Sequence, residues 1–193
     1  MSGLSKKVVL VTGAGKGSGR RVAESFAAQG AAVAVNDVSP VNLDETVAHI
    51  KAAGGNVKAY VEDIAKKMPV QTLLNQVLDD FGRIDILVNC AEVEPTLSVL
   101  EMDDWDWQRT LDVNLSGAFL LTQSVGRIMK EKGGGVIIQM GARARGPERR
   151  AAYFASKAGA AALVETAGEE FAAFGVHVHL VQTPSEALEA CDQ

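Results

Sequence analysis

The chain has 193 residues, 47% hydrophobic and 22% charged, which are the proportions of a globular protein with a substantial core. Its net charge of −5 argues against nucleic acid as the main partner, and its two cysteines are too few for a disulfide framework and lack metal-ligand spacing. Because no apolar run reaches a membrane span and residues 1–7 leave no room for a secretory signal, we expect a cytoplasmic protein.

Apolar, β-branched runs alternate with segments of helical periodicity along the whole chain. The predicted strands are 8–11, 31–36, 57–61, 84–89, 136–139 and 176–181, and the predicted helices are 18–29, 41–53, 69–81, 103–131 and 152–174. Continuous apolar strands separated by helices indicate a parallel sheet covered on both faces. We therefore expect one doubly wound α/β domain with six strands over residues 1–193, ending in a short acidic tail.

A glycine-rich loop, residues 12–20, follows the first predicted strand and opens the first predicted helix. The unpaired N–H groups and the positive dipole end of a helix N-terminus attract an anion, and glycines let a pyrophosphate approach the backbone. The predicted phosphate-binding residues are Gly13, Lys16, Gly17, Ser18 and Gly19. Such a loop alone is a weak signal, but its position between strand and helix predicts a dinucleotide site.

Asp37 ends the second predicted strand. In a dinucleotide-binding fold this carboxylate hydrogen-bonds the adenosine ribose and repels a 2′-phosphate, so it favours NAD over NADP. A loop or helix-capping role is the alternative, because turn-forming residues follow it. Lys16, Arg20 and Arg21 oppose the NAD assignment, since they could meet an extra phosphate, but we expect most of them to be solvated or near the pyrophosphate.

The third and fourth predicted strands also end in polar residues, at the sheet edge where such folds bind ligands. Asp63 could lie against the adenine ring or form a turn. Cys90, which ends an apolar strand, is interpreted as a small buried hydrophobe. Glu92 and Glu94 could act as acids or metal ligands, but we expect solvated loop charges.

The later helices carry two further groups of candidates. Asn114 is an amide in an apolar helix that must find partners, so it is either a structural clamp or part of a site. Tyr153 and Lys157 are four residues apart and share a helix face. An ammonium beside a phenol lowers its pKa and lets it exchange a proton near neutral pH, although a solvated pair is the alternative. Trp105 and Trp107 are expected to pack in the core.

Together these motifs resemble the short-chain dehydrogenase/reductase family over almost the whole chain. The resemblance implies a Rossmann fold and NAD(P)-dependent interconversion of an alcohol and a ketone, with a 3-oxoacyl or small-ketone substrate. It implies that Tyr153 passes the proton, that Lys157 holds the ribose and tunes the tyrosine, and that Asn114 orders a relay water. The other cofactor contacts that it implies are the glycine loop, Asp37, Asp63, Asn89 and Ala91.

The sequence departs from the family pattern at three places. The catalytic serine position aligns with Ala142, and residues 136–152 contain neither serine nor threonine, although Arg143 or Arg145 could supply a donor. The fourth residue of the Asn-Asn-Ala-Gly motif is Glu92 rather than the glycine that admits the cofactor. The chain also stops before the family's C-terminal segment, which builds the substrate lid, another helix and a last strand.

These departures leave two functional hypotheses open, besides the possibility that the chain is a truncated product of a longer enzyme. The first is an NAD-linked oxidoreductase with an atypical site, acting on a small-molecule substrate. The second is a dinucleotide-binding sensor or subunit without catalytic activity. In either case we expect a homodimer, because the family's four-helix subunit contact uses the Asn114 helix and the small-residue helix at 158–162, whereas its second contact uses the missing C-terminal elements.

Overall fold

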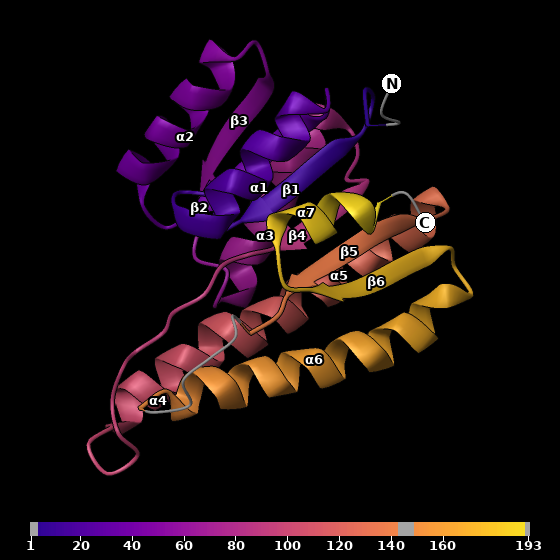
Figure 1. The fold of residues 1–193 in the computed structure, drawn as a ribbon. Helices are drawn as coiled ribbons and strands as arrows, with labels where there is room; N and C mark the ends of the chain where they lie inside the picture. Colours follow the sequence, from indigo (N-terminus) through magenta and orange to yellow (C-terminus); the bar gives the residue numbers. More distant parts are fainter. Residues whose placement is uncertain (1–3, 143–148, 192–193) are drawn as a thin grey trace.

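The computed structural model describes residues 4–142 and 149–191. Within these ranges the chain forms a six-stranded parallel sheet in the order β3-β2-β1-β4-β5-β6 (Figure 1). The strands are β1 (Val8–Thr12), β2 (Ala32–Asp37), β3 (Asn56–Val61), β4 (Ile86–Asn89), β5 (Gly135–Met140) and β6 (Val176–Val181). The predicted doubly wound fold is confirmed, with strand ends shifted by no more than about two residues, the usual uncertainty of such boundaries.

Helices cover both faces of the sheet. One face carries α1 (Gly17–Ala28), α2 (Pro40–Ala52) and α7 (Pro184–Glu189). The other carries α3 (Lys67–Phe81) and α5 (Ala118–Lys132), with α6 (Ala151–Ala172) packed beside α5. Strand β1 shows why both faces must be covered: Val9 and Val11 belong to the first core, whereas Val8 and Leu10 belong to the second.

The helix predicted over 103–131 is divided. It begins as α4 (Asp104–Leu111), continues as a π-helical segment over Asp112–Gly117 and ends as α5. A π-helical turn inside a helix is rare and often marks a functional site. This one contains Asn114, one of the predicted site residues.

The expected acidic tail contains a helix, α7, which lies near α1 (Figure 1). The Thr183 hydroxyl accepts a hydrogen bond from the Glu186 N–H at 3.3 Å, and Pro184 occupies the first helical turn. Ala187 is fully buried in the core that α1 shares with the sheet. The signal for this helix was present in the sequence, since Thr-Pro-x-Glu combines a capping box with an N-terminal proline.

Candidate functional site

A cavity of about 470 Å³ opens beside the glycine loop and the carboxyl ends of β2, β3 and β4. Its walls also include Arg109 of α4 and Val113 of the π-helical segment. The predicted cofactor residues among its walls are Gly13, Lys16, Gly17, Ser18, Gly19, Asp37, Asp63 and Ala91. Residues distant in the sequence are thus brought together at the edge where parallel α/β sheets bind ligands.

The glycine loop has the backbone form that an anion site needs. Gly13 and Gly17 have φ values of 62° and 61°, a region that side chains disfavour. A Cβ on Gly19 would collide with the Gly13 carbonyl oxygen, so the loop can pack against α1 only with glycine there. Lys16, the N-cap of α1, has no side-chain cap among the described residues, which leaves this helix end to interact with an anion.

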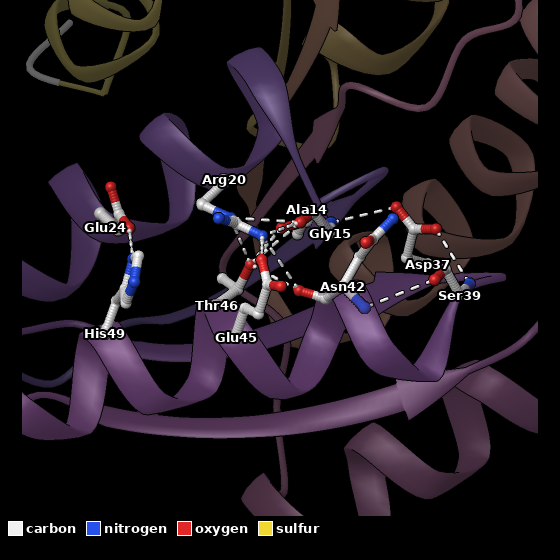
Figure 2. A network of polar contacts seen from close by, with 10 residues as sticks. All are labelled: Ala14, Gly15, Arg20, Glu24, Asp37, Ser39, Asn42, Glu45, Thr46 and His49. Carbon is white, nitrogen blue, oxygen red and sulfur yellow. Dashed lines mark hydrogen bonds and ion pairs between the residues drawn. The ribbon is translucent and has the colours of Figure 1, made fainter.

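Asp37 is held by two backbone N–H groups, as Figure 2 shows. Its carboxylate accepts hydrogen bonds from Gly15 and from Ser39, each at 3.0 Å. A Cβ on Gly15 would approach the Asp37 Oδ2 to 2.8 Å, so this close contact requires glycine. The carboxylate therefore combines the predicted loop role with a position in the cavity wall.

Arg20 is directed toward α2 (Figure 2). Its guanidinium donates to the Gly15 carbonyl oxygen, to the Thr46 hydroxyl at 3.0 Å and to the Glu45 carboxylate at 2.8 Å. These bonds hold together the glycine loop and α2. Arg20 is not among the residues that line the described cavity.

Asp63 also combines the two roles left open for it. One carboxylate oxygen accepts a hydrogen bond from the Ala65 N–H at 3.1 Å, which forms the turn after β3. The other oxygen is 3.5 Å from the Lys66 ammonium and 3.9 Å from the Arg109 guanidinium. The same side chain lies in the cavity wall.

Asn89 and Cys90 are both buried where β4 ends. The Asn89 amide has no hydrogen-bond partner among the described residues, and Asn89 is not among those that line the cavity. Burial raises the pKa of the Cys90 thiol to about 12; the nearby Lys157 ammonium opposes this rise, and the Glu92 carboxylate adds to it. Cys90 is thus buried, as its sequence position predicted.

Tyr153 and Lys157 lie together near the start of α6, and both are buried, Tyr153 with no exposed surface. The Lys157 ammonium donates to the Met140 carbonyl oxygen at 3.0 Å and lies 5.6 Å from the centre of the Tyr153 ring. The alternative of a solvated pair is therefore wrong. A buried ammonium beside a phenol is the arrangement expected of a proton-transfer site.

Glu92 contacts both members of this pair. Its carboxylate is 2.8 Å from the Lys157 ammonium and accepts a 3.4 Å hydrogen bond from the Tyr153 hydroxyl. Glu94 forms a 2.6 Å ion pair with Arg150. The expectation that both glutamates are solvated loop charges is wrong, because each finds a cation brought close by the folding of α6.

Asn114 connects three parts of the site. Its amide nitrogen donates to the Val93 carbonyl oxygen at 2.9 Å and to the Ser156 hydroxyl at 3.0 Å, and its oxygen accepts from the Val93 N–H at 2.8 Å. The buried amide thus fixes the loop after β4 against α6. The sequence left two roles open for Asn114, a structural clamp or part of a site, and these bonds are those of a clamp.

The position that aligns with the family's serine is Ala142, two residues after the end of β5. Arg143 and Arg145, the suggested replacements, lie outside the described residues. Arg149 and Arg150, from the same basic stretch, form ion pairs with two glutamates on the neighbouring loop.

The fold and site therefore define an α/β protein of the Rossmann type with a buried tyrosine–lysine pair at the ligand edge of its sheet. The sequence profile of the family described as short chain dehydrogenase matches residues 7–186. The chain belongs to this family of oxidoreductases, as its motifs predicted.

Known proteins resemble the chain over most of its length. A 3-oxoacyl-(acyl-carrier-protein) reductase from Synechocystis sp. is 40% identical over 184 residues, which cover 94% of this chain and 74% of the relative. A metagenomic short-chain oxidoreductase solved in complex with NADP has a TM-score of 0.90 at 30% identity, covering 97% of this chain and 90% of that one. An NAD⁺-bound xylitol dehydrogenase also has a TM-score of 0.90, at 32% identity, covering 94% and 71%.

These similarities leave the choice of cofactor open, because one solved structure holds NADP and the other NAD⁺. Within the described parts of the chain, no helix combines the length and the apolar character that crossing a membrane requires.

Proposed function

We propose that this chain is an oxidoreductase that uses NAD to interconvert an alcohol and a ketone. The observation that carries the proposal is the buried Tyr153–Lys157 pair, which is linked through Glu92 to the cavity beside the glycine loop. The nicotinamide cofactor supplies or accepts the hydride. The chain's own residues bind the cofactor and move the proton.

The glycine loop and the α1 N-terminus fit a pyrophosphate, since the loop glycines keep side chains away and the helix end attracts negative charge. Asp37 would accept hydrogen bonds from the adenosine ribose, and Asp63 would lie beside the adenine. The negative charge of Asp37 supports NAD over NADP. Arg20 could have attracted the extra phosphate of NADP, but its guanidinium is bonded to residues of α2 instead.

In the proposed reaction the Tyr153 hydroxyl exchanges a proton with the substrate oxygen. Lys157 would stabilise the tyrosinate and would hold the nicotinamide-side ribose. Asn114 holds the loop after β4, and in the proposed reaction it would also order a relay water. Because Ala142 offers no hydroxyl to the developing charge, we expect turnover about 10²–10³-fold below that of a site with such a donor.

The test is NADH oxidation against a panel of ketones and 3-oxoacyl thioesters, with calorimetry to measure NAD binding. Tyr153→Phe should abolish turnover and leave NAD affinity within about threefold, because it removes the proton and little contact area. Tyr60→Phe is the matched control: Tyr60 is the chain's other tyrosine and bonds Asp80 on α3 at 2.8 Å. Equal turnover by wild type and Tyr153→Phe would refute the proposed role of Tyr153.

A dinucleotide-binding protein without catalysis is the second candidate. It is favoured by Ala142 in the serine position and by the Glu92 contact with Lys157. NAD binding in the absence of turnover over the whole panel would select this candidate.

We also propose a homodimer formed through α4, α5 and α6. Trp105 and Trp107, expected in the core, are instead exposed on α4, and Phe119 is exposed on α5. Large apolar side chains that remain exposed on one pair of helices support a subunit contact there.

A further inference from the structure

Glu92 stands between the cavity and the catalytic pair. The described cavity walls include Glu92 but neither Tyr153 nor Lys157. Both of these side chains contact the Glu92 carboxylate, at 3.4 Å and 2.8 Å respectively. A ligand in the cavity therefore meets Glu92 before it can reach the ammonium of Lys157.

The electrostatics of the pair favour this contact. The Lys157 side chain is 2% exposed, so its charge is shielded from water and depends on protein partners. The Glu92 side chain, 13% exposed, supplies an opposite charge, and the Met140 carbonyl oxygen accepts a second hydrogen bond. A carboxylate bonds an ammonium more strongly than a neutral hydroxyl does.

The two halves of a dinucleotide therefore meet different surroundings. The adenosine and pyrophosphate would face the glycine loop, Asp37 and Asp63, whereas the second ribose would meet Glu92 in the wall of the same cavity. Because Glu92 lines the cavity and contacts Lys157, which does not line it, the hydroxyls of the second ribose must displace the Glu92 carboxylate to reach the ammonium. An ion pair must be broken for a neutral contact to form.

We propose that Glu92 competes with the cofactor for Lys157, so that the nicotinamide half of NAD adds little affinity and the cavity binds ADP about as tightly as NAD. This proposal rests on the proposed function, which assigns the ribose to Lys157. Under this proposal Glu92 determines the relative affinity of the site for ADP and NAD.

The test is calorimetry with ADP and with NAD on wild type, Glu92→Gly and Glu92→Gln. In wild type the two dissociation constants should agree within about threefold. Glu92→Gly should tighten NAD binding about tenfold, the value of one hydrogen bond to a charged group, and should leave ADP binding unchanged. Glu92→Gln retains the shape and removes the charge, so it should give a smaller gain in the same direction.

Glu94→Gln is the matched control, because Glu94 lies in the same loop and pairs with Arg150 rather than Lys157. It should change neither dissociation constant. Thermal unfolding provides a second readout: Glu92→Gly should melt at a lower temperature than wild type without nucleotide, since it leaves a buried charge unpaired, and saturating NAD should raise its midpoint more than that of wild type.

The outcomes distinguish a failure of this proposal from a failure of the proposed function on which it rests. If wild type binds NAD much more tightly than ADP and Glu92→Gly brings no gain, the competition by Glu92 is refuted while the dinucleotide site stands. If neither nucleotide binds to wild type or to the variants, both proposals fail.

Discussion

At the residue scale, Asp37 has a fixed orientation, because the N–H groups of Gly15 and Ser39 both bond its carboxylate. In the proposed binding mode Asp37 lies beside the adenosine ribose, where a fixed negative charge would repel a 2′-phosphate more than a mobile one. Arg20, a cation that could have offset this effect, is bonded to Thr46 and Glu45 instead.

We therefore predict that NADP binds at least about tenfold more weakly than NAD. Asp37→Ala should narrow this ratio, because it removes the repelling charge. It also removes an acceptor from the Gly15 N–H and should weaken both cofactors, so the ratio of the two dissociation constants is the quantity to compare. Asp44→Ala, which removes an exposed carboxylate from α2, is the control. Tighter binding of NADP by wild type would overturn the assignment.

Cys90 provides a second prediction at this scale. Burial raises the pKa of its thiol to about 12, so the reactive thiolate is scarce at any pH below that value. In the native protein, iodoacetamide at pH 8 should leave Cys90 unmodified, and the same treatment after unfolding should modify it. Peptide mass spectrometry distinguishes the two states. Rapid labelling of native Cys90 would show that the end of β4 opens readily.

At the scale of elements, the hydrophobic pattern of the sequence was sufficient to predict the six strands. A continuous buried apolar run such as that of β1 is typical of a strand with helices on both faces, and β2 and β4 share this pattern. The π-helical segment could not be predicted in this way, because an i→i+5 turn keeps the same apolar residues as the α-helix around it. Helix α7 was missed although its capping residues were readable.

The candidate site likewise has one part that the sequence predicts and another that only the tertiary fold reveals. The residues of the glycine loop line one cavity because they are neighbours in sequence and follow one strand. The partner of Glu92 could not be predicted, because Lys157 lies on a helix far along the chain and only the tertiary fold brings the two together. A glutamate in place of glycine was visible in the sequence; its ion pair was not.

Helix α7 depends on its first turn. The Thr183 hydroxyl caps the Glu186 N–H, so Thr183→Ala should destabilise this end of the chain by about 1 kcal/mol. Chemical denaturation and amide exchange in α7 would measure the loss. Thr166→Ala, at an exposed position within α6, is the control and should lack this effect.

Glu186 makes the same turn sensitive to pH. Hydrogen bonds from the Gln182 N–H and then from the Thr183 side chain lower the pKa of its carboxyl. A carboxyl whose pKa is lower in the folded state stabilises that state above its unfolded pKa, about 4.3, and loses the contribution as pH falls through the folded value. Amide protection in α7 should therefore decrease on acidification below about pH 4, and Glu186→Gln should reduce this dependence. An unchanged dependence in that variant would assign it to another group.

At the scale of the whole molecule, the strand order explains where the site lies. The chain builds the sheet outward from β1 to β3, then returns to the other side of β1 with β4 and continues to β6. Where this order reverses, the loops after β1 and β4 diverge to opposite faces and leave a crevice. The cavity lies there, between the glycine loop and residues 90–93.

The same architecture leaves aromatic surface on the helices that we propose to form a dimer. Trp105 of α4 is 69% exposed and Phe119 of α5 is 44% exposed. Gly159 of α6 is already used within the chain, because a Cβ there would approach Leu115 to 3.0 Å. The exposed aromatic residues are therefore stronger support for a subunit contact than the small residues are.

Light scattering at micromolar concentration should give twice the 20.3 kDa mass of one chain. Phe119→Asp should shift this mass toward that of the monomer, because a charge buried in an apolar contact without a partner is costly. Met68→Asp, which adds the same charge at an exposed position near the start of α3, should leave the mass unchanged. A monomer or a tetramer in the unmodified protein would refute the dimer. If Phe119→Asp remains a dimer, the subunit contact does not involve this position of α5.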